Sequence, residues 1–231
     1  MNREDKLLEC LAFLNKANSE FSNSTICKVS SEQKKEYSRL LKDFKDAHNN
    51  GRSTAEKGKS LENLVAYLLS ISGGIFEVFQ NVRTNTNEID QIVRLSQKGK
   101  ILLSCNLLNK LYENFICECK NHSSSIKVTY VGKLYSLMRS CDIKLSILFS
   151  YKGVSGNKWN NSAGLIRKMY IAKDYNGEHD VIIDFNIKDF ETIENGGNFL
   201  DIVENKIASL KFDTDFSTYI SSHPAEGKFD L

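Results

Sequence analysis

Apolar positions follow a helical spacing up to about residue 72 and then change to the short runs that are typical of strands. In the helical stretch, the apolar side chains that share one face are Leu61, Leu64, Val65, Leu68 and Leu69. Ser53 and Glu56 precede them at the spacing of a capping box, and Gly73 and Gly74 end the helix. Five later runs are predicted as strands: 75–82, 88–95, 115–120, 145–150 and 180–185.

Helical segments lie between or beside the later strands, over 127–140, 160–172 and 199–211. The order of the elements predicts an α/β fold with one central mixed β-sheet flanked by helices. The early strands follow one another directly, so we expect an antiparallel meander that then passes into crossover connections. Helical spacing within residues 1–50 predicts an N-terminal helical extension, and the main domain is expected to span 51–231.

Composition narrows the class of protein without naming a function. The 31 basic and 29 acidic residues give a net charge of +2, which argues against binding through a polybasic surface, although an acidic metal site and a basic groove can cancel in this sum. The six cysteines have neither disulfide-framework nor zinc spacing, which favours buried thiols in a reducing cytosol. With no signal peptide and no membrane-length apolar run, we expect a cytoplasmic protein without a membrane partner.

Charged residues interrupt two strands that are expected near the centre of the sheet. In the second strand, alternation places Asp90 on one face and both Ile89 and Gln91 on the other. In the third strand, Glu118 and Lys120 share one face. A charge in such a strand is costly unless it is paired or binds a metal, so the three charged residues are candidates for a functional site.

The chemistry that suits these residues is metal-assisted hydrolysis. Carboxylate oxygens are the preferred ligands of Mg²⁺ and Mn²⁺, so Asp90 and Glu118 are candidate ligands, with the backbone carbonyl of Cys119 as a third. Lys120 would then face the same cavity. There it could orient or deprotonate the attacking water, or stabilise the charge that builds up on a phosphate.

The segment from about Lys57 to Ser155 resembles the catalytic core of the PD-(D/E)xK nucleases, especially the stand-alone restriction-endonuclease group related to Mrr. Three pieces match in order. Glu62 lies in the helix before the sheet, where the family has an acidic residue; the run NEIDQIV contains Asp90; and FICECKN supplies the E-x-K of Glu118 and Lys120.

The resemblance implies a restriction-endonuclease-like core over 51–231 and a Mg²⁺-dependent endodeoxyribonuclease activity, with Mn²⁺ able to replace Mg²⁺. The substrate would be DNA, cut to leave a 5′-phosphate, and a role in defence against foreign DNA would follow. Glu62 would be an auxiliary metal ligand or would support the ligands, although a glutamate at the solvent edge of the helix is the alternative. His122 and Lys133 are candidates for contacts with nucleic acid, and solvated surface residues are the alternative for both.

Two other functions stay open. The same metal site would serve a nuclease that cuts RNA or a nucleic-acid junction, and a substrate panel would separate these from a DNA nuclease. A catalytically silent nucleic-acid-binding module is the alternative from another class. A homodimer is a further hypothesis, because two active sites are the simplest way to cut both strands, and the N-terminal helices would supply the interface.

Overall fold

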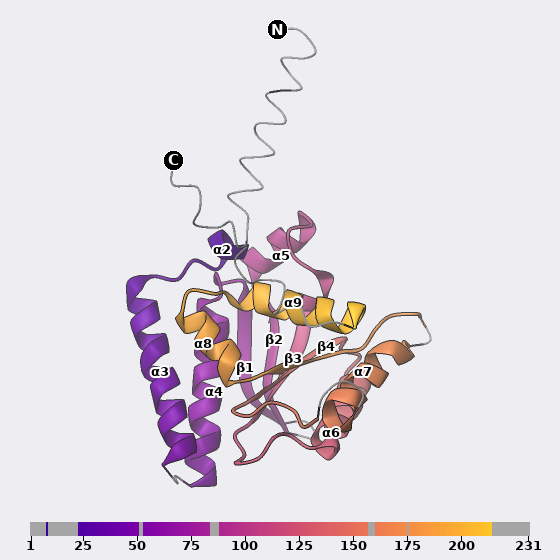
Figure 1. The fold of residues 1–231 in the computed structure, drawn as a ribbon. Coiled ribbons are helices and arrows are strands. Elements are labelled where there is room, and N and C mark those ends of the chain that lie inside the picture. Colours follow the sequence, from indigo (N-terminus) through magenta and orange to yellow (C-terminus); the bar gives the residue numbers. More distant parts are fainter. Residues whose placement is uncertain are drawn as a thin grey trace, which may run out of the picture.

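Five strands form one mixed sheet in the computed structural model, which describes residues 23–50, 53–83, 88–156, 160–174 and 176–213 together with Leu8 (Figure 1). The strands are β1 (Phe76–Arg83), β2 (Glu88–Leu95), β3 (Asn114–Lys120), β4 (Leu145–Ser150) and β5 (Val181–Phe185), and they lie side by side in chain order. Neighbours from β1 to β3 are antiparallel, and those from β3 to β5 are parallel. The predicted α/β class and the change from meander to crossover are therefore confirmed, and the predicted strand ranges agree with the observed ones to within one residue.

Helices cover both faces of this sheet (Figure 1). They are α2 (Asn23–Ile26), α3 (Ser31–Asn49), α4 (Thr54–Ile71), α5 (Gln97–Ser104), the 3₁₀ helix η1 (Lys110–Tyr112), α6 (Val128–Ser140), α7 (Asn161–Ala172), α8 (Ile187–Glu194) and α9 (Phe199–Phe212). The predicted helices over 127–140, 160–172 and 199–211 correspond to α6, α7 and α9, whereas α5 and α8 were not predicted as helices. Within the described ranges, no helix combines the length and hydrophobicity that a membrane crossing requires.

The two faces of the sheet bury two separate sets of apolar side chains. Phe115, Cys117 and Cys119 of β3 join the larger cluster, which α3, α4, α8 and α9 complete. Ile116 points to the other face, where α6 and α7 cover a smaller cluster. All six residues of β4 are buried, as expected for a central strand covered on both sides.

Helix α3 is part of the main core. Its buried residues Tyr37, Leu41 and Phe44 belong to the larger cluster, and the Tyr37 hydroxyl donates a hydrogen bond to the Phe190 carbonyl at 2.9 Å. The described part of the predicted N-terminal extension, 23–50, therefore packs into the same core as the rest of the chain. The rest of that extension, apart from Leu8, lies outside the described residues.

The capping box at the start of α4 is present as predicted. The Ser53 hydroxyl accepts from the Glu56 amide at 3.3 Å, and the Glu56 carboxylate accepts from the Ser53 amide at 3.0 Å. We expect Ser53→Ala to lower the free energy of unfolding by about 1 kcal/mol, because it leaves an amide of the first turn without its acceptor. Urea unfolding measures the change, and Ser53→Thr, which keeps the hydroxyl, is the control. Equal stability of the alanine and threonine variants would contradict the role of the cap.

Candidate functional site

The strands β2 and β3 separate at the position of Asp90. Their ladder runs from the pair Arg94–Asn114 to the pair Gln91–Cys117. Two residues further along β3, the Cys119 amide donates instead to Oδ2 of the Asp90 carboxylate, at 2.7 Å. A side chain of β2 thus satisfies a backbone donor of β3, which places the carboxylate in the fork between the two strands.

The same fork changes the direction of Ile89. Alternation places Ile89 on the face of Gln91 and Val93, and this expectation is wrong: Ile89 joins the smaller cluster with Ile116, whereas Val93 lies in the larger one. The ladder with β3 has ended here, and on β1 the residue opposite Asp90, Asn81, has a φ of 51°. Without the ladder the strand twists, so strict alternation fails at this point.

The structure brings Asp90, Glu118 and Lys120 together at the fork, and we call them the carboxylate–lysine cluster. The Lys120 ammonium (Nζ) lies 2.7 Å from Oε1 of Glu118 and 3.3 Å from Oδ2 of Asp90. Their side chains keep 24%, 20% and 16% of their surface exposed for Lys120, Glu118 and Asp90 respectively. The cluster is therefore mostly withdrawn from water but retains partial contact with solvent.

Two carboxylates share one ammonium in this cluster. Burial raises the pKa of Glu118, and the adjoining Lys120 offsets only part of that rise. For Lys120, burial alone lowers the pKa, but the Glu118 and Asp90 carboxylates outweigh burial and hold the pKa above its ordinary value. The negative charges outnumber the positive one, so an additional cation would be favourable here.

The donor set fits a magnesium ion. The contacts described above engage Oδ2 of Asp90 and Oε1 of Glu118, which leaves the second oxygen of each carboxylate for a cation. Magnesium commonly takes one or two carboxylates and completes its shell with water and substrate phosphate. No group of three or more His, Cys, Asp or Glu side chains suited to a metal occurs in the described part of the chain. Coordination of the Cys119 carbonyl stays a prediction.

Glu62 lies beside the fork without joining the cluster. Its carboxylate is 4.0 Å from the Lys59 ammonium, and its side chain is 22% exposed. The negative charge of Glu62 contributes to the raised pKa of the buried Cys119 thiol, behind burial and the charges of Asp90 and Cys117. The backbone carbonyl of Glu62 accepts a hydrogen bond at 3.0 Å from the side-chain amide (Nε2) of the fully buried Gln91. This bond connects α4 to β2.

The two candidate nucleic-acid contacts lie near the cluster. His122 follows β3, with its ring 5.2 Å from that of Tyr130, and its buried Nε2 has no hydrogen-bond partner among the described residues. Lys133 is exposed on α6, and its charge is close enough to lower the pKa of Glu118 slightly against the dominant effect of burial. Contact of either residue with nucleic acid stays a prediction.

Sequence reasoning missed a histidine next to the site. Asn121 follows Lys120 directly, and its amide nitrogen donates to the Lys57 carbonyl at 3.0 Å, so its oxygen faces Nδ1 of His48 at 2.6 Å. That oxygen can only accept, so Nδ1 of His48 is the donor in this hydrogen bond. The ring of Tyr151 stacks on His48 at 3.7 Å.

We expect Asn121→Ala to lower the free energy of unfolding by roughly 1–3 kcal/mol, because it removes the acceptor of the His48 N–H and one of the donors to the Lys57 carbonyl, which keeps the Ser60 hydroxyl. Asn121 is only 8% exposed, so water replaces these hydrogen bonds poorly. Urea unfolding provides the measurement. Asn114→Ala, at the exposed start of β3, is the control and should change stability by less than about 0.5 kcal/mol. Equal effects of the two variants would contradict the network.

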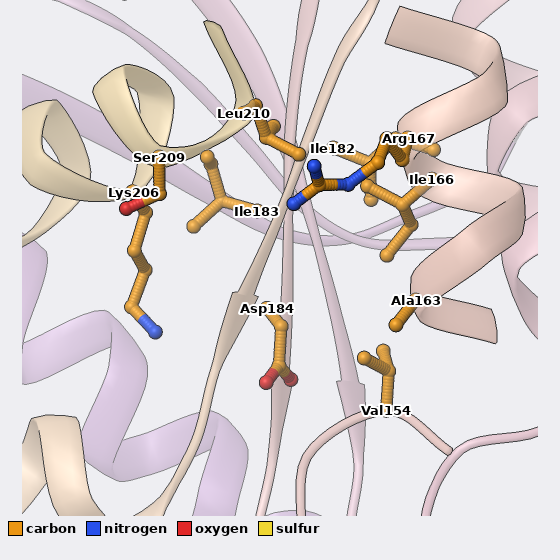
Figure 2. A pocket seen from close by; sticks show the side chains of 10 residues that line it. All are labelled: Val154, Ala163, Ile166, Arg167, Ile182, Ile183, Asp184, Lys206, Ser209 and Leu210. Atoms are coloured by element: carbon orange, nitrogen blue, oxygen red, sulfur yellow. The ribbon is translucent and has the colours of Figure 1, made fainter. Parts of the chain in front are cut away.

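A separate cavity of about 190 Å³ lies between β5, α7 and α9, and Figure 2 shows Asp184 and Lys206 among its lining side chains. Burial raises the pKa of Asp184, and its Oδ1 oxygen is buried without a hydrogen bond from any described residue. The strand pairing places Leu148 between Asp184 and Glu118. Asp184 is therefore not part of the carboxylate–lysine cluster.

Comparisons with known proteins leave the family open. No family model matches the chain, and no solved structure matches it. An uncharacterized protein of Methanocaldococcus jannaschii is 34% identical over 115 residues, which is 46% of this chain and 46% of that protein. The chain thus spans about half the length of this curated relative, whose description names no activity.

Proposed function

We propose that this protein is a magnesium-dependent nuclease with a restriction-endonuclease-like core, which hydrolyses phosphodiester bonds in DNA. The observation that carries the proposal is the meeting of Asp90, Glu118 and Lys120 at the fork between β2 and β3. Two carboxylates and a lysine that are mostly withdrawn from water destabilise a fold unless they are paired or bind a ligand. Hydrolysis of a phosphodiester gives each of them a task.

The roles follow from the contacts. Asp90 and Glu118 would hold Mg²⁺, which supplies positive charge at the scissile phosphate and acidifies water. Lys120 is held as an ammonium by its two partners, so it would donate hydrogen bonds to the attacking water or to a phosphate oxygen as negative charge builds up there. The Cys119 amide fixes Asp90 in the fork, so the ligand carboxylate is oriented before substrate binds.

A cleavage assay tests the proposal. Purified protein is incubated with supercoiled plasmid, single-stranded DNA and RNA, each with Mg²⁺, Mn²⁺ or EDTA. We expect nicked or linear plasmid with either ion and none with EDTA. Cutting of RNA alone would replace DNA as the substrate. Binding without cutting by either ion would overturn the nuclease activity in favour of a binding module. A role in defence against foreign DNA rests on the family resemblance alone.

A further inference from the structure

A groove of about 650 Å³ opens at the carboxyl ends of the three parallel strands. The loop after β3 contributes three consecutive serines, Ser123, Ser124 and Ser125. The loop after β4 contributes Lys152, and the first turn of α8, which follows β5, contributes Lys188. The carboxyl edge of parallel strands is the usual place for ligands in α/β proteins, because the loops there diverge and leave a crevice.

The groove begins where the strand beside the carboxylate–lysine cluster ends. Lys120 and Ser150 are paired at the ends of β3 and β4, so the groove-lining Tyr151 follows the strand next to Lys120. Tyr151 stacks on His48, and His48 is hydrogen-bonded to Asn121, the residue after Lys120. The groove and the cluster therefore lie at the same, carboxyl end of the parallel strands β3 and β4.

The charges of the groove favour an anion. Lys152 and Lys188 are exposed, and neither forms an ion pair with another described residue. By contrast, Lys45 on α3 pairs with Glu191 at 2.9 Å, and Lys206 on α9 pairs with Asp189 at 3.0 Å. No acidic side chain lines the groove. Two unpaired ammonium groups and a row of hydroxyl donors are the groups that commonly hold phosphate oxygens.

We propose that this groove binds the phosphodiester backbone of the DNA strand next to the bond that is cut. The ammonium groups of Lys152 and Lys188 contact phosphate oxygens, and the hydroxyls of Ser123 and Ser124 donate hydrogen bonds to the same backbone. The identity of the ligand rests on the proposed nuclease function. The contacts themselves involve only backbone phosphates, so the groove adds affinity and position without reading the base sequence.

Fluorescence anisotropy with a fluorescein-labelled DNA duplex tests the groove. The titration is performed in EDTA over a series of salt concentrations, so that binding is measured without cutting. We expect Lys152→Gln/Lys188→Gln to bind more weakly than the unmodified protein. The slope of log affinity against log salt should also decrease by about 0.9 for each lost phosphate contact, so by nearly two. The control is Lys34→Gln/Lys100→Gln, which removes two exposed lysines, on α3 and α5, that do not line the groove.

The outcomes separate the groove from the nuclease function. Equal affinity and equal salt slope for the groove variant and the control would overturn the groove, even if the protein cuts DNA. A selective loss of binding in the groove variant supports the groove, even if no substrate is cut in the cleavage assay. A labelled RNA of the same sequence is titrated in parallel. Groove-dependent binding of RNA but not of DNA would overturn the assignment to a DNA strand.

Discussion

Lys120→Ala is expected to reduce the rate of metal-dependent DNA cleavage by roughly 10²- to 10³-fold, the usual effect of removing one donor to a developing negative charge. Lys120 is the cation that contacts both carboxylates, at 2.7 Å and 3.3 Å, so its loss leaves Glu118 and Asp90 without their shared counter-charge. The initial rate of nicking of supercoiled plasmid in Mg²⁺ is the measurement.

A second variant distinguishes loss of chemistry from loss of fold. Asp90→Asn keeps a side-chain oxygen that can accept from the Cys119 amide, so the fork should persist, but it removes one negative charge from the metal site. We expect it to lose cleavage while its thermal unfolding stays close to that of the unmodified protein. Asp142→Asn is the control, because Asp142 is exposed and has a φ of 52°, which asparagine adopts readily. Full activity of Asp90→Asn would contradict the proposed metal site.

The strands of the sheet could be predicted because apolar runs and alternation are patterns within a single short segment of sequence. The strand β4 was predicted over 145–150 and occupies Leu145–Ser150, since an apolar run bounded by polar residues suits a central strand buried on both faces. Alternation likewise places Glu118 and Lys120 on one face, which their 2.7 Å contact agrees with. The side chains of one strand can be assigned to faces without knowing what packs against them.

The fork and its surroundings were not predictable in the same way, because they depend on contacts between distant segments. His48 and Asn121 are 73 residues apart and meet only when α3 packs beside the end of β3. The direction of Ile89 changes because the ladder with β3 stops, and no periodicity within β2 contains that information. The groove is built from loops after three strands. The carboxylates could be identified from sequence, but not the geometry that orients them.

Phe190→Ala is expected to lower the free energy of unfolding by about 3–5 kcal/mol, the usual cost of truncating a buried aromatic residue. Phe190 is fully buried, with its ring 5.0 Å from Phe185 and 5.7 Å from Phe44, so the truncation opens a cavity between α8, the sheet and α3. Urea unfolding measures the loss. Phe79→Ala, at a 40% exposed position of β1, should cost far less. A decrease in the free energy of unfolding of less than about 1 kcal/mol for Phe190→Ala would contradict this prediction. It would mean that the packing of α3 and α8 around Phe190 contributes little to the stability of the core.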